Sequence, residues 1–210
     1  MKPTPRRRRP EARPDEILDA ALSVFAEQGF TAARVEDIAR RAGLSKGAVY
    51  LYFPSKEAML NALVEQSAGA LAKAAEKLVA LGAPKDPEAA LRSLVFMLVT
   101  AMTDPDISAA PRLVLTEAQR FPEIAQYYRT HVLDIARGAL KALLAAGIAG
   151  GNFRPVDGDI LMRFVAGPVL AHMVLATIFD MAPETLREPA DIADALCDLL
   201  LNGLKPRTEP

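Results

Sequence analysis

The chain has 210 residues, 51% of them hydrophobic, and its 25 Lys and Arg against 26 Asp and Glu give a formal net charge of −1. This length and apolar content allow one large domain or two small ones with a real hydrophobic core. The single cysteine, Cys197, excludes a disulfide framework and a cysteine-based metal site.

The charge is unevenly distributed along the chain. Residues 1–53 hold 10 Lys and Arg against 7 Asp and Glu, whereas residues 54–210 hold 15 against 19. A basic N-terminal part on an acidic body suits a protein that directs one end toward nucleic-acid phosphates. Asp19 and Glu27 interrupt the apolar run near the N-terminus, so no signal peptide is expected and the predicted location is cytoplasmic.

Residues 1–12 are rich in proline and arginine, with an unbroken run from Arg6 to Arg9, and they lack apolar periodicity. We predict a disordered basic arm that adds contacts to DNA phosphates or to the minor groove. The alternative is a solvated tail that contributes only general charge.

The first helix is expected to begin at Arg13-Pro14-Asp15-Glu16, with proline in the first turn and carboxylates near the positive end of the helix dipole. Its apolar residues recur on one face, and Gly29 closes it. These residues are Ile17, Leu18, Ala21, Leu22 and Phe25.

Two short helices joined by a glycine turn follow in Val35–Phe53. The first has helical apolar spacing and ends at Gly43, and Ser45 can cap the second, which must stop before Pro54. This arrangement is typical of a helix-turn-helix motif, whose second helix enters the DNA major groove. The alternative is an ordinary helical hairpin with a glycine turn.

The run AALSVFAEQGF…VEDIARRAGLSKGAVYLYFPSKEAML closely resembles the N-terminal domain of TetR-type transcriptional regulators, over roughly Arg13 to Val64. The resemblance implies a DNA-binding domain in residues 13–54. Two positions depart from the family pattern: Ala33-Arg34 stands where relatives often carry Thr, which removes an expected helix cap, and Tyr52 stands where many have His. The residues expected to bind double-stranded DNA are Arg34, Ser45, Lys46, Gly47, Ala48, Tyr50, Tyr52 and Lys56.

The rest of the chain shows helical periodicity and turns without an alternating strand pattern, so the predicted fold is all-α with about nine helices. Residues 55–205 are expected to form a larger helical ligand-binding and dimerisation domain. Its helices are predicted at Ser55–Gly82, Asp86–Met102, Pro111–Arg120, Phe121–Ala149, Asp157–Phe179 and Pro189–Gly203. A helix break is expected at Asp104-Pro105 and a loop at residues 150–155.

The last two helices carry more apolar residues than one helical layer readily buries. In TetR-type regulators the corresponding pair forms a four-helix interface in a homodimer, which lets two recognition helices read two half-sites. The alternative is that both helices close the core of a monomer. The expected interface residues are Val165, Val169, Met173, Ile192, Leu196, Leu199 and Leu200.

The resemblance also implies a small-molecule effector bound within the larger domain. Polar residues embedded in apolar runs, with aromatic and methionine neighbours, are the candidates for the pocket. They are Phe96, Met97, Thr100, Glu117, Tyr127, Tyr128, His131, Arg163, Phe164, His172 and Met173. For each of them an ordinary structural role is the alternative, such as an Arg163–Asp159 pair one helical turn apart.

An enzyme is the rival class, but the sequence has no Gly-rich phosphate loop, no H-x-x-x-H or H-E-x-x-H spacing and no G-x-S-x-G motif. We therefore expect no catalytic residue, no metal and no cofactor. The most apolar stretch, Phe164–Phe179, is about 16 residues long, short of a bilayer span, so no membrane partner is expected. A DNA-binding regulator without a small-molecule effector remains the second alternative.

Overall fold

The computed structural model describes residues 13–179, 181 and 188–205, and every regular element among them is a helix, which confirms the all-α prediction. The basic arm predicted for residues 1–12 lies outside the described residues. The described chain forms two compact units. The first contains residues 13–66 and 109–127, and the second contains residues 67–108 and those from 128 onward. The predicted boundary after residue 54 did not anticipate that residues 109–127 would pack with the N-terminal helices.

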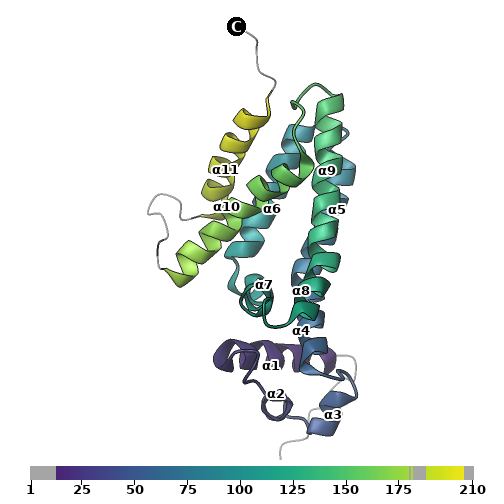
Figure 1. The fold of residues 1–210 in the computed structure, drawn as a ribbon, viewed down its shortest axis with the longest axis vertical. Helices are drawn as coiled ribbons and strands as arrows, with labels where there is room; N and C mark the ends of the chain where they lie inside the picture. Colours follow the sequence, from purple (N-terminus) through teal and green to yellow (C-terminus); the bar gives the residue numbers. More distant parts are fainter. Residues whose placement is uncertain (1–12, 180, 182–187, 206–210) are drawn as a thin grey trace, which may run out of the picture. The chain divides into compact units, whose positions relative to one another are not determined.

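The first unit is built on four helices whose apolar faces meet in one core. Phe25, Ile38, Val49 and Leu60 are fully buried, and they come from four different helices. The first helix packs against the second and the fourth, and the second packs against the third. These elements are α1 (Arg13–Gln28), α2 (Val35–Arg41), α3 (Lys46–Tyr50) and α4 (Lys56–Val64), as Figure 1 shows.

Two of the predicted helix caps are present in this unit. The Ser45 hydroxyl accepts a hydrogen bond from the Ala48 amide at 3.2 Å, and the Ser55 hydroxyl accepts one from the Ala58 amide at 3.1 Å. At the start of α2 the cap position is Arg34, whose side chain makes no capping bond, because guanidinium has no acceptor atom. The sequence predicted that α2 lacks a side-chain cap at residues 33–34. The structure shows that the uncapped position is Arg34.

The loop after α1 connects the N-terminal helices to residues 109–127. The Phe30 ring makes edge-to-face contacts with Phe25 at 5.0 Å and with Phe121 at 5.1 Å between ring centroids. Beside it, the Thr31 hydroxyl donates to a Glu117 carboxylate oxygen at 3.5 Å and accepts from Arg120 at 3.2 Å. These long-range contacts explain why the segment belongs to this unit.

Helix α7 (Pro105–Glu117) begins six residues earlier than predicted. Asp104 was expected to end the preceding helix and leave a loop. Instead its carboxylate caps α7 and accepts hydrogen bonds from the amides of Asp106 at 2.8 Å and Ile107 at 3.1 Å. Pro111, expected at the start, lies inside the helix. The next helix, α8 (Pro122–Tyr128), begins one residue after the predicted start at Phe121 and has its proline in the first turn as expected.

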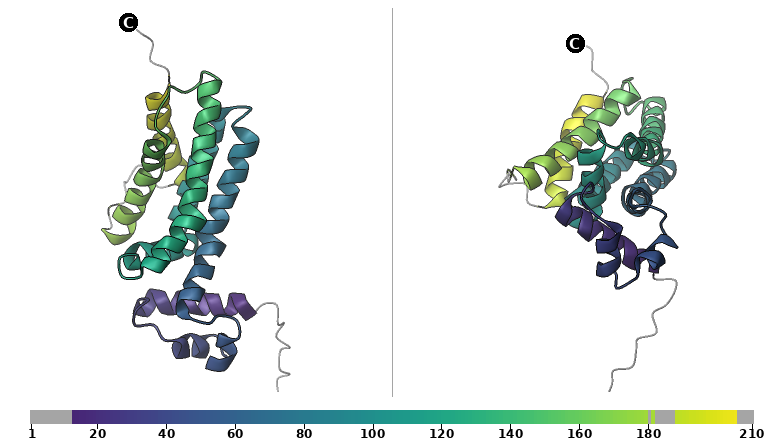
Figure 2. Two further views of the ribbon diagram at one scale, coloured as in Figure 1. Left: turned by 45° about the vertical axis from the view of Figure 1, so that its right-hand side comes forward. Right: turned by 60° about the horizontal axis from the view of Figure 1, so that its bottom comes forward.

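The second unit is a bundle around one central helix, as Figures 1 and 2 show. The central helix, α6, packs against each of the other four, and its Leu91, Leu94, Val95 and Val99 are all buried. Cys197 lies in the same core, and burial raises the pKa of its thiol, as expected for an inert side chain. The helices are α5 (Ala70–Gly82), α6 (Pro87–Thr103), α9 (Asp134–Ala149), α10 (Gly158–Ile178) and α11 (Pro189–Leu204).

Two helices predicted as continuous are interrupted by π-helical segments, Glu65–Gly69 between α4 and α5 and Arg129–Leu133 between α8 and α9. The chain passes between the two units inside the first segment and directly before the second. A π-helical segment has no signature in apolar periodicity, which is why the sequence predicted single helices here.

The loop between α9 and α10 is fixed to the rest of the second unit. The Phe153 ring packs over Gly147, where a Cβ atom would lie 2.0 Å from the Phe153 Cδ2 atom. Arg154 donates its amide to the Leu204 carbonyl at 2.8 Å and its Nε to the Gly203 carbonyl at 2.7 Å. The loop predicted at residues 150–155 thereby holds the end of α11.

Helix α10 matches the predicted range Asp157–Phe179 to within one residue at each end. Within it, residues Gly158–Ala176 have the length and composition of a membrane span, which core helices can also have, so the prediction that its apolar stretch is too short to span a bilayer was wrong. The helix packs against α6, α9 and α11. Three of its large apolar residues, Ile160, Phe164 and Leu175, are exposed.

Candidate nucleic-acid interface and apolar cavity

The short helix α3 presents a polar surface with few bulky side chains. Val49 is fully buried and fixes the helix on the core, while Lys46, Gly47 and Tyr50 are exposed. Gly43 adopts a φ of 66° between α2 and α3, a conformation that glycine takes without strain. A Cβ atom on Gly47 would meet nothing within 4 Å, so this position is open to an approaching molecule.

Lys46 is paired within the unit in this structure. Its Nζ atom lies 2.5 Å from a Glu36 carboxylate oxygen and 5.7 Å from the centre of the Tyr50 ring. The hydrogen bond lowers the pKa of Glu36 and raises the pKa of Lys46. Because both side chains are about half exposed, the pair is weak, and a DNA phosphate can compete with Glu36 for the lysine.

Two other expected DNA contacts lie at the edges of this surface. Arg34 is exposed at the start of α2, and Tyr52 is exposed after the end of α3. The neighbouring Arg41 is bound to Glu27 through two contacts of 2.6 Å and serves to join α2 to α1.

The structure gives Lys56 a different role from the phosphate contact that was expected. Its Nζ atom donates to the Phe30 carbonyl at 2.7 Å and to the Thr31 carbonyl at 3.1 Å, and it lies 4.7 Å from the centre of the Phe30 ring. The ammonium group thus satisfies two carbonyls just after α1. Lys56 is therefore a stabilising residue of the loop.

Leu51 is a surface residue that the sequence analysis missed. It directly follows α3 and is 84% exposed, more than either Tyr50 or Tyr52. An apolar side chain at such a position can contact the methyl group of thymine. The available signal was helical spacing, since Leu51 is two residues after the buried Val49 and so falls on the opposite side.

The second unit contains an apolar cavity of about 110 Å³. Its walls come from α5, α6, α9, α10, both π-helical segments and the last residue of α8. Met97, Met102 and Met162 provide flexible thioether side chains in these walls. Tyr128 is the only residue with a side-chain polar group in the lining, which contains no charged residue.

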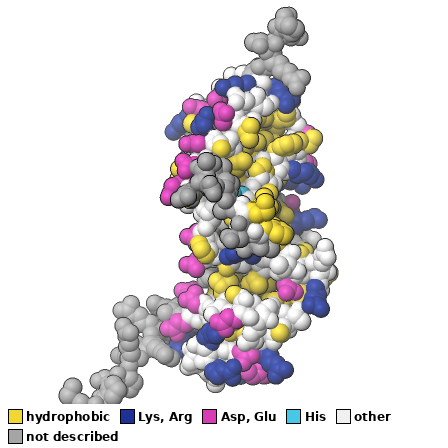
Figure 3. Space-filling view, turned by 90° about the vertical axis from the view of Figure 1, so that its left-hand side faces the viewer, with side chains coloured by type: hydrophobic (Ala, Val, Ile, Leu, Met, Phe, Trp, Pro, Cys, Tyr) yellow, Lys and Arg dark blue, Asp and Glu magenta, His cyan; other side chains and the backbone are white. Residues whose placement is uncertain are grey.

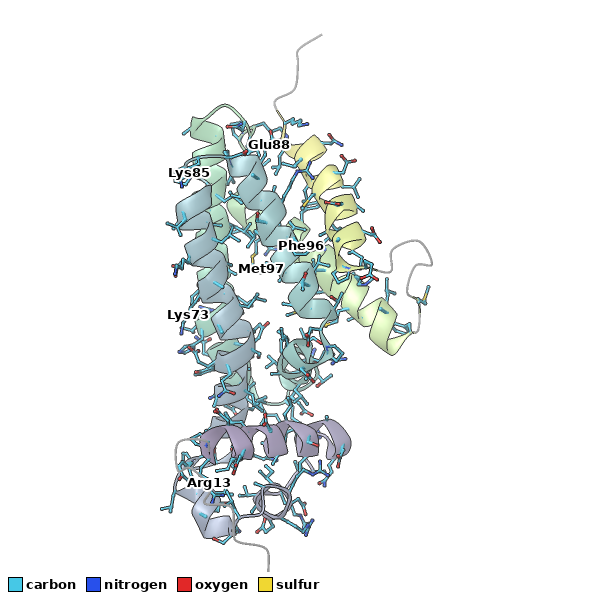
Figure 4. The ribbon with its side chains drawn as sticks, turned by 180° about the vertical axis from the view of Figure 1, so that it is seen from behind. Arg13, Lys73, Lys85, Glu88, Phe96 and Met97 are labelled. Carbon is cyan, nitrogen blue, oxygen red and sulfur yellow. The ribbon has the colours of Figure 1, made fainter. Side chains whose placement is uncertain are left out.

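Of the eleven predicted pocket residues, Met97 and Tyr128 line this cavity. Figure 4 shows Phe96 and Met97 as neighbours on α6, but Phe96 is 47% exposed and lies outside the lining. Glu117 belongs to the first unit, where it accepts the Thr31 hydrogen bond, and Arg163 donates to the Asp159 carbonyl at 2.7 Å. The other predicted residues, which also lie outside the lining, are Thr100, Tyr127, His131, Phe164, His172 and Met173.

The structure corrects the expected dimer interface. Val165, Val169, Met173 and Ile192 are each at most 5% exposed, and Val165 and Val169 line the cavity, so these side chains serve the protomer's own interior. Leu196 and Leu200 are partly buried against the same core. Leu199, by contrast, is 74% exposed.

An exposed apolar face lies on the other side of the same two helices. Ile160, Phe164, Leu199 and Leu200 border a groove of about 220 Å³ between α10 and α11. Figure 3 views this side of the second unit and shows hydrophobic side chains gathered on its surface. Such a patch is typical of an interaction surface.

Two family sequence models match the chain. The model described as "Bacterial regulatory proteins, tetR family" matches residues 17–63, and "Tetracyclin repressor-like, C-terminal domain" matches residues 85–193. The first match covers α2 and α3 and most of α1 and α4, and the second covers more than half of the chain. The resemblance found in the sequence is confirmed.

Similar proteins agree with these matches. The uncharacterized HTH-type transcriptional regulator YfiR of Bacillus subtilis (strain 168) is 31% identical over 159 residues, 75% of this chain and 76% of that protein. The HTH-type transcriptional repressor KstR2 of Rhodococcus jostii (strain RHA1) is 31% identical over 157 residues, 71% and 72% of the two chains. The structure of the fatty acid degradation regulator FadR from Bacillus halodurans superposes with a TM-score of 0.73 at 27% identity, covering 99% and 100%. The chain thus belongs to the TetR family and is a ligand-responsive, DNA-binding transcriptional regulator.

Proposed function

We propose that the protein is a homodimeric repressor that binds a near-palindromic operator and releases it when an apolar effector enters the cavity of the second unit. The cavity is the observation that carries this proposal, because it is apolar and is bordered by the segments through which the chain passes between the units. The likeness to the repressor KstR2 supports repression over activation.

The surface of α3 supports DNA binding through a combination of direct and charged contacts. Gly47 allows close approach of the backbone, Tyr50 and Leu51 offer contacts to bases or sugar, and Lys46 offers a phosphate contact. Glu36 competes with the phosphate for Lys46, which weakens binding that depends on charge alone. The arm in residues 1–12 is proposed to add charge-dependent affinity.

The apolar face of α10 and α11 supports a two-fold dimer. Ile160, Phe164 and Leu199 are each at least half exposed, and they flank one groove. In a two-fold arrangement each protomer contributes the same side chains, so the patch contributes its apolar area twice to one interface. Two copies of α3 then face successive major grooves of one operator.

The π-helical segments support communication between the cavity and the DNA-binding unit. Ala68 of the first segment and Val132 and Leu133 of the second line the cavity. A π-helical turn has poorer hydrogen-bond geometry than an α-helical turn and is often found at functional sites. We propose that a ligand in the cavity changes these two turns, and that the change alters the spacing of the two DNA-binding units.

The test begins with selection of genomic DNA fragments on the purified protein, which is expected to yield a near-palindromic sequence. A labelled duplex of that sequence is then titrated with apolar compounds, and fatty-acid-derived compounds come first because of the likeness to FadR. Loss of duplex binding on addition of a compound supports the effector role. Duplex binding that no compound changes would favour the alternative, a regulator without a small-molecule effector.

The proposal includes no catalytic activity, no membrane partner and a location in the cytoplasm. Among the described residues, no cluster of three or more His, Cys, Asp or Glu side chains has the geometry to hold a metal ion. Turnover of a compound that binds in the cavity would instead support the alternative of an all-α enzyme.

A further inference from the structure

The cavity described above has one chemical asymmetry. Seventeen of its eighteen lining residues are apolar, and the remaining one is Tyr128. This tyrosine is the last residue of α8 and directly precedes the π-helical segment Arg129–Leu133, two of whose residues also line the cavity.

The Tyr128 hydroxyl makes no hydrogen bond to any of the residues that the structure describes. Burial raises the pKa of Tyr128 to about 12, so the group is an uncharged O–H donor at neutral pH. The hydroxyl oxygen keeps some accessible surface, so a ligand can reach it. Because Tyr128 lines an otherwise apolar cavity, its unpaired hydroxyl is a specificity element for a ligand that brings an acceptor.

The lining also restricts the charge of that ligand. It contains no Lys, Arg or His to pair with a carboxylate or phosphate, and no Asp or Glu to pair with an amine. Burial of an unpaired charge in such surroundings is strongly unfavourable. Any charged group of an effector must consequently stay outside the cavity.

The volume of the cavity limits how much of a ligand can enter it. One water molecule needs about 10–15 Å³ of such volume, so a cavity of about 110 Å³ accommodates roughly ten non-hydrogen atoms. Three methionine side chains in the walls allow some variation of ligand shape.

From these observations we infer that the cavity selects an apolar group carrying one uncharged carbonyl, a ketone or an ester, whose oxygen accepts a hydrogen bond from Tyr128. The inference rests on the proposed effector role of the cavity and names the class of compound that fills it. Free carboxylic acids in their ionised form are excluded, even though their hydrocarbon parts fit.

The experiment uses four probes of similar size, about ten to twelve non-hydrogen atoms each. They are 4-phenyl-2-butanone, methyl 3-phenylpropanoate, n-butylbenzene and 4-phenylbutyrate. Affinities for the full-length protein are obtained from the shift of the melting temperature with probe concentration at pH 7. The variants are Tyr128→Phe, which removes only the hydroxyl, and Tyr127→Phe, the same change in the adjacent residue that lies outside the lining.

Tyr128→Phe is expected to weaken ketone and ester binding by about three- to tenfold and to leave n-butylbenzene binding unchanged. Tyr127→Phe should leave the ketone, the ester and n-butylbenzene at wild-type affinity. The wild-type protein should bind 4-phenylbutyrate at least about a hundredfold more weakly than the ketone. If Tyr128→Phe weakens the binding of only the ketone or only the ester, that result supports the inference and identifies which of the two carbonyl compounds the cavity binds.

Two results would overturn the inference. One is an equal effect of Tyr128→Phe on all the uncharged probes, or no effect on any of them, and the other is tight binding of the carboxylate. These outcomes leave the effector role of the cavity standing. If the probes bind as expected but never change the affinity for the selected operator, the effector role fails while the assignment of Tyr128 stands. If no probe binds to any variant, both fail.

Discussion

Replacement of Leu199 by arginine tests the surface through which two protomers are proposed to associate. Leu199 is 74% exposed on α11 and borders the groove between α10 and α11. Because the side chain already lies in solvent in the protomer, Leu199→Arg should leave the stability of the protomer almost unchanged. The expected effect is on the dimer alone.

The size of the effect follows from the exposed area. Full burial of a leucine side chain stabilises by about 1.5–3 kcal/mol, so the exposed three quarters of Leu199 represent about 1–2 kcal/mol per protomer. Two-fold symmetry doubles this to about 2–4 kcal/mol per dimer. Burial of two guanidinium groups against apolar side chains adds several kcal/mol more. We therefore expect the dimer to weaken by at least about a thousandfold.

Sedimentation velocity at micromolar concentration, together with a thermal melt and a duplex-binding titration, measures the three consequences. Leu199→Arg should sediment as a folded monomer, and it should lose specific binding while weak nonspecific binding persists, because a single unit reads only one half-site. Leu81→Arg is the matched control, since Leu81 is 63% exposed on α5, outside the groove. It should remain a dimer that binds the operator.

A second comparison separates the interface from the core. Val169→Arg, on α10, places a charge at a position that is 3% exposed and lines the cavity. It should lower the melting temperature strongly, whereas Leu199→Arg should not. A Leu199→Arg variant that stays dimeric, or a monomeric variant that binds the full operator tightly, would refute this account of the interface.

Three further changes test other parts of the molecule. Gly47→Glu should abolish operator binding without a change in the melting temperature, since a side chain fits there in the free protein but meets DNA phosphates in the complex; wild-type affinity would contradict the placement of α3. Lys56→Met keeps the aliphatic stem and removes the donor to the Phe30 carbonyl, so thermal and denaturant unfolding should show a loss of about 1–3 kcal/mol, and an unchanged stability would contradict the role given to this lysine. Gly147→Ala forces Phe153 to move and should lower the free energy of unfolding by about 1–3 kcal/mol without loss of the helical circular dichroism signal, whereas unchanged stability would show that the ring shifts freely.

Much of the fold was predictable because the signals that form and end helices are local. Ser45 and Ser55 cap the helices that follow them, and Asp157 caps α10 with its carboxylate. The same holds for the helix-turn-helix unit, where the apolar positions of α2, the Gly43 turn and the α3 cap lie within a few residues of one another. Because all the residues that form such a cap or turn are neighbours in the sequence, the sequence alone is enough to predict them. The prediction of a break at Asp104 was wrong because a proline after it is compatible with both a helix break and the first residue of a helix.

The roles of several residues depend on contacts between segments far apart in the sequence. Lys56 binds carbonyls 26 and 25 residues earlier, at Phe30 and Thr31, and nothing in its own neighbourhood distinguishes such a lysine from one that binds phosphate. Tyr128 differs from Tyr127 only in what the bundle places opposite it. Periodicity gave no indication of the two π-helical segments that border the cavity.

The clearest division between sequence and structure concerns α10 and α11. Apolar residues lie on both sides of these helices, so the sequence determined that they are helical and that they need partners on more than one side. It could not determine which side the protomer itself buries. Packing against α6 and α9 placed Val165 and Val169 inside and left Phe164 and Leu199 in solvent. The choice belongs to the tertiary structure, because burial depends on what the other helices bring into contact and not on the composition of the helix.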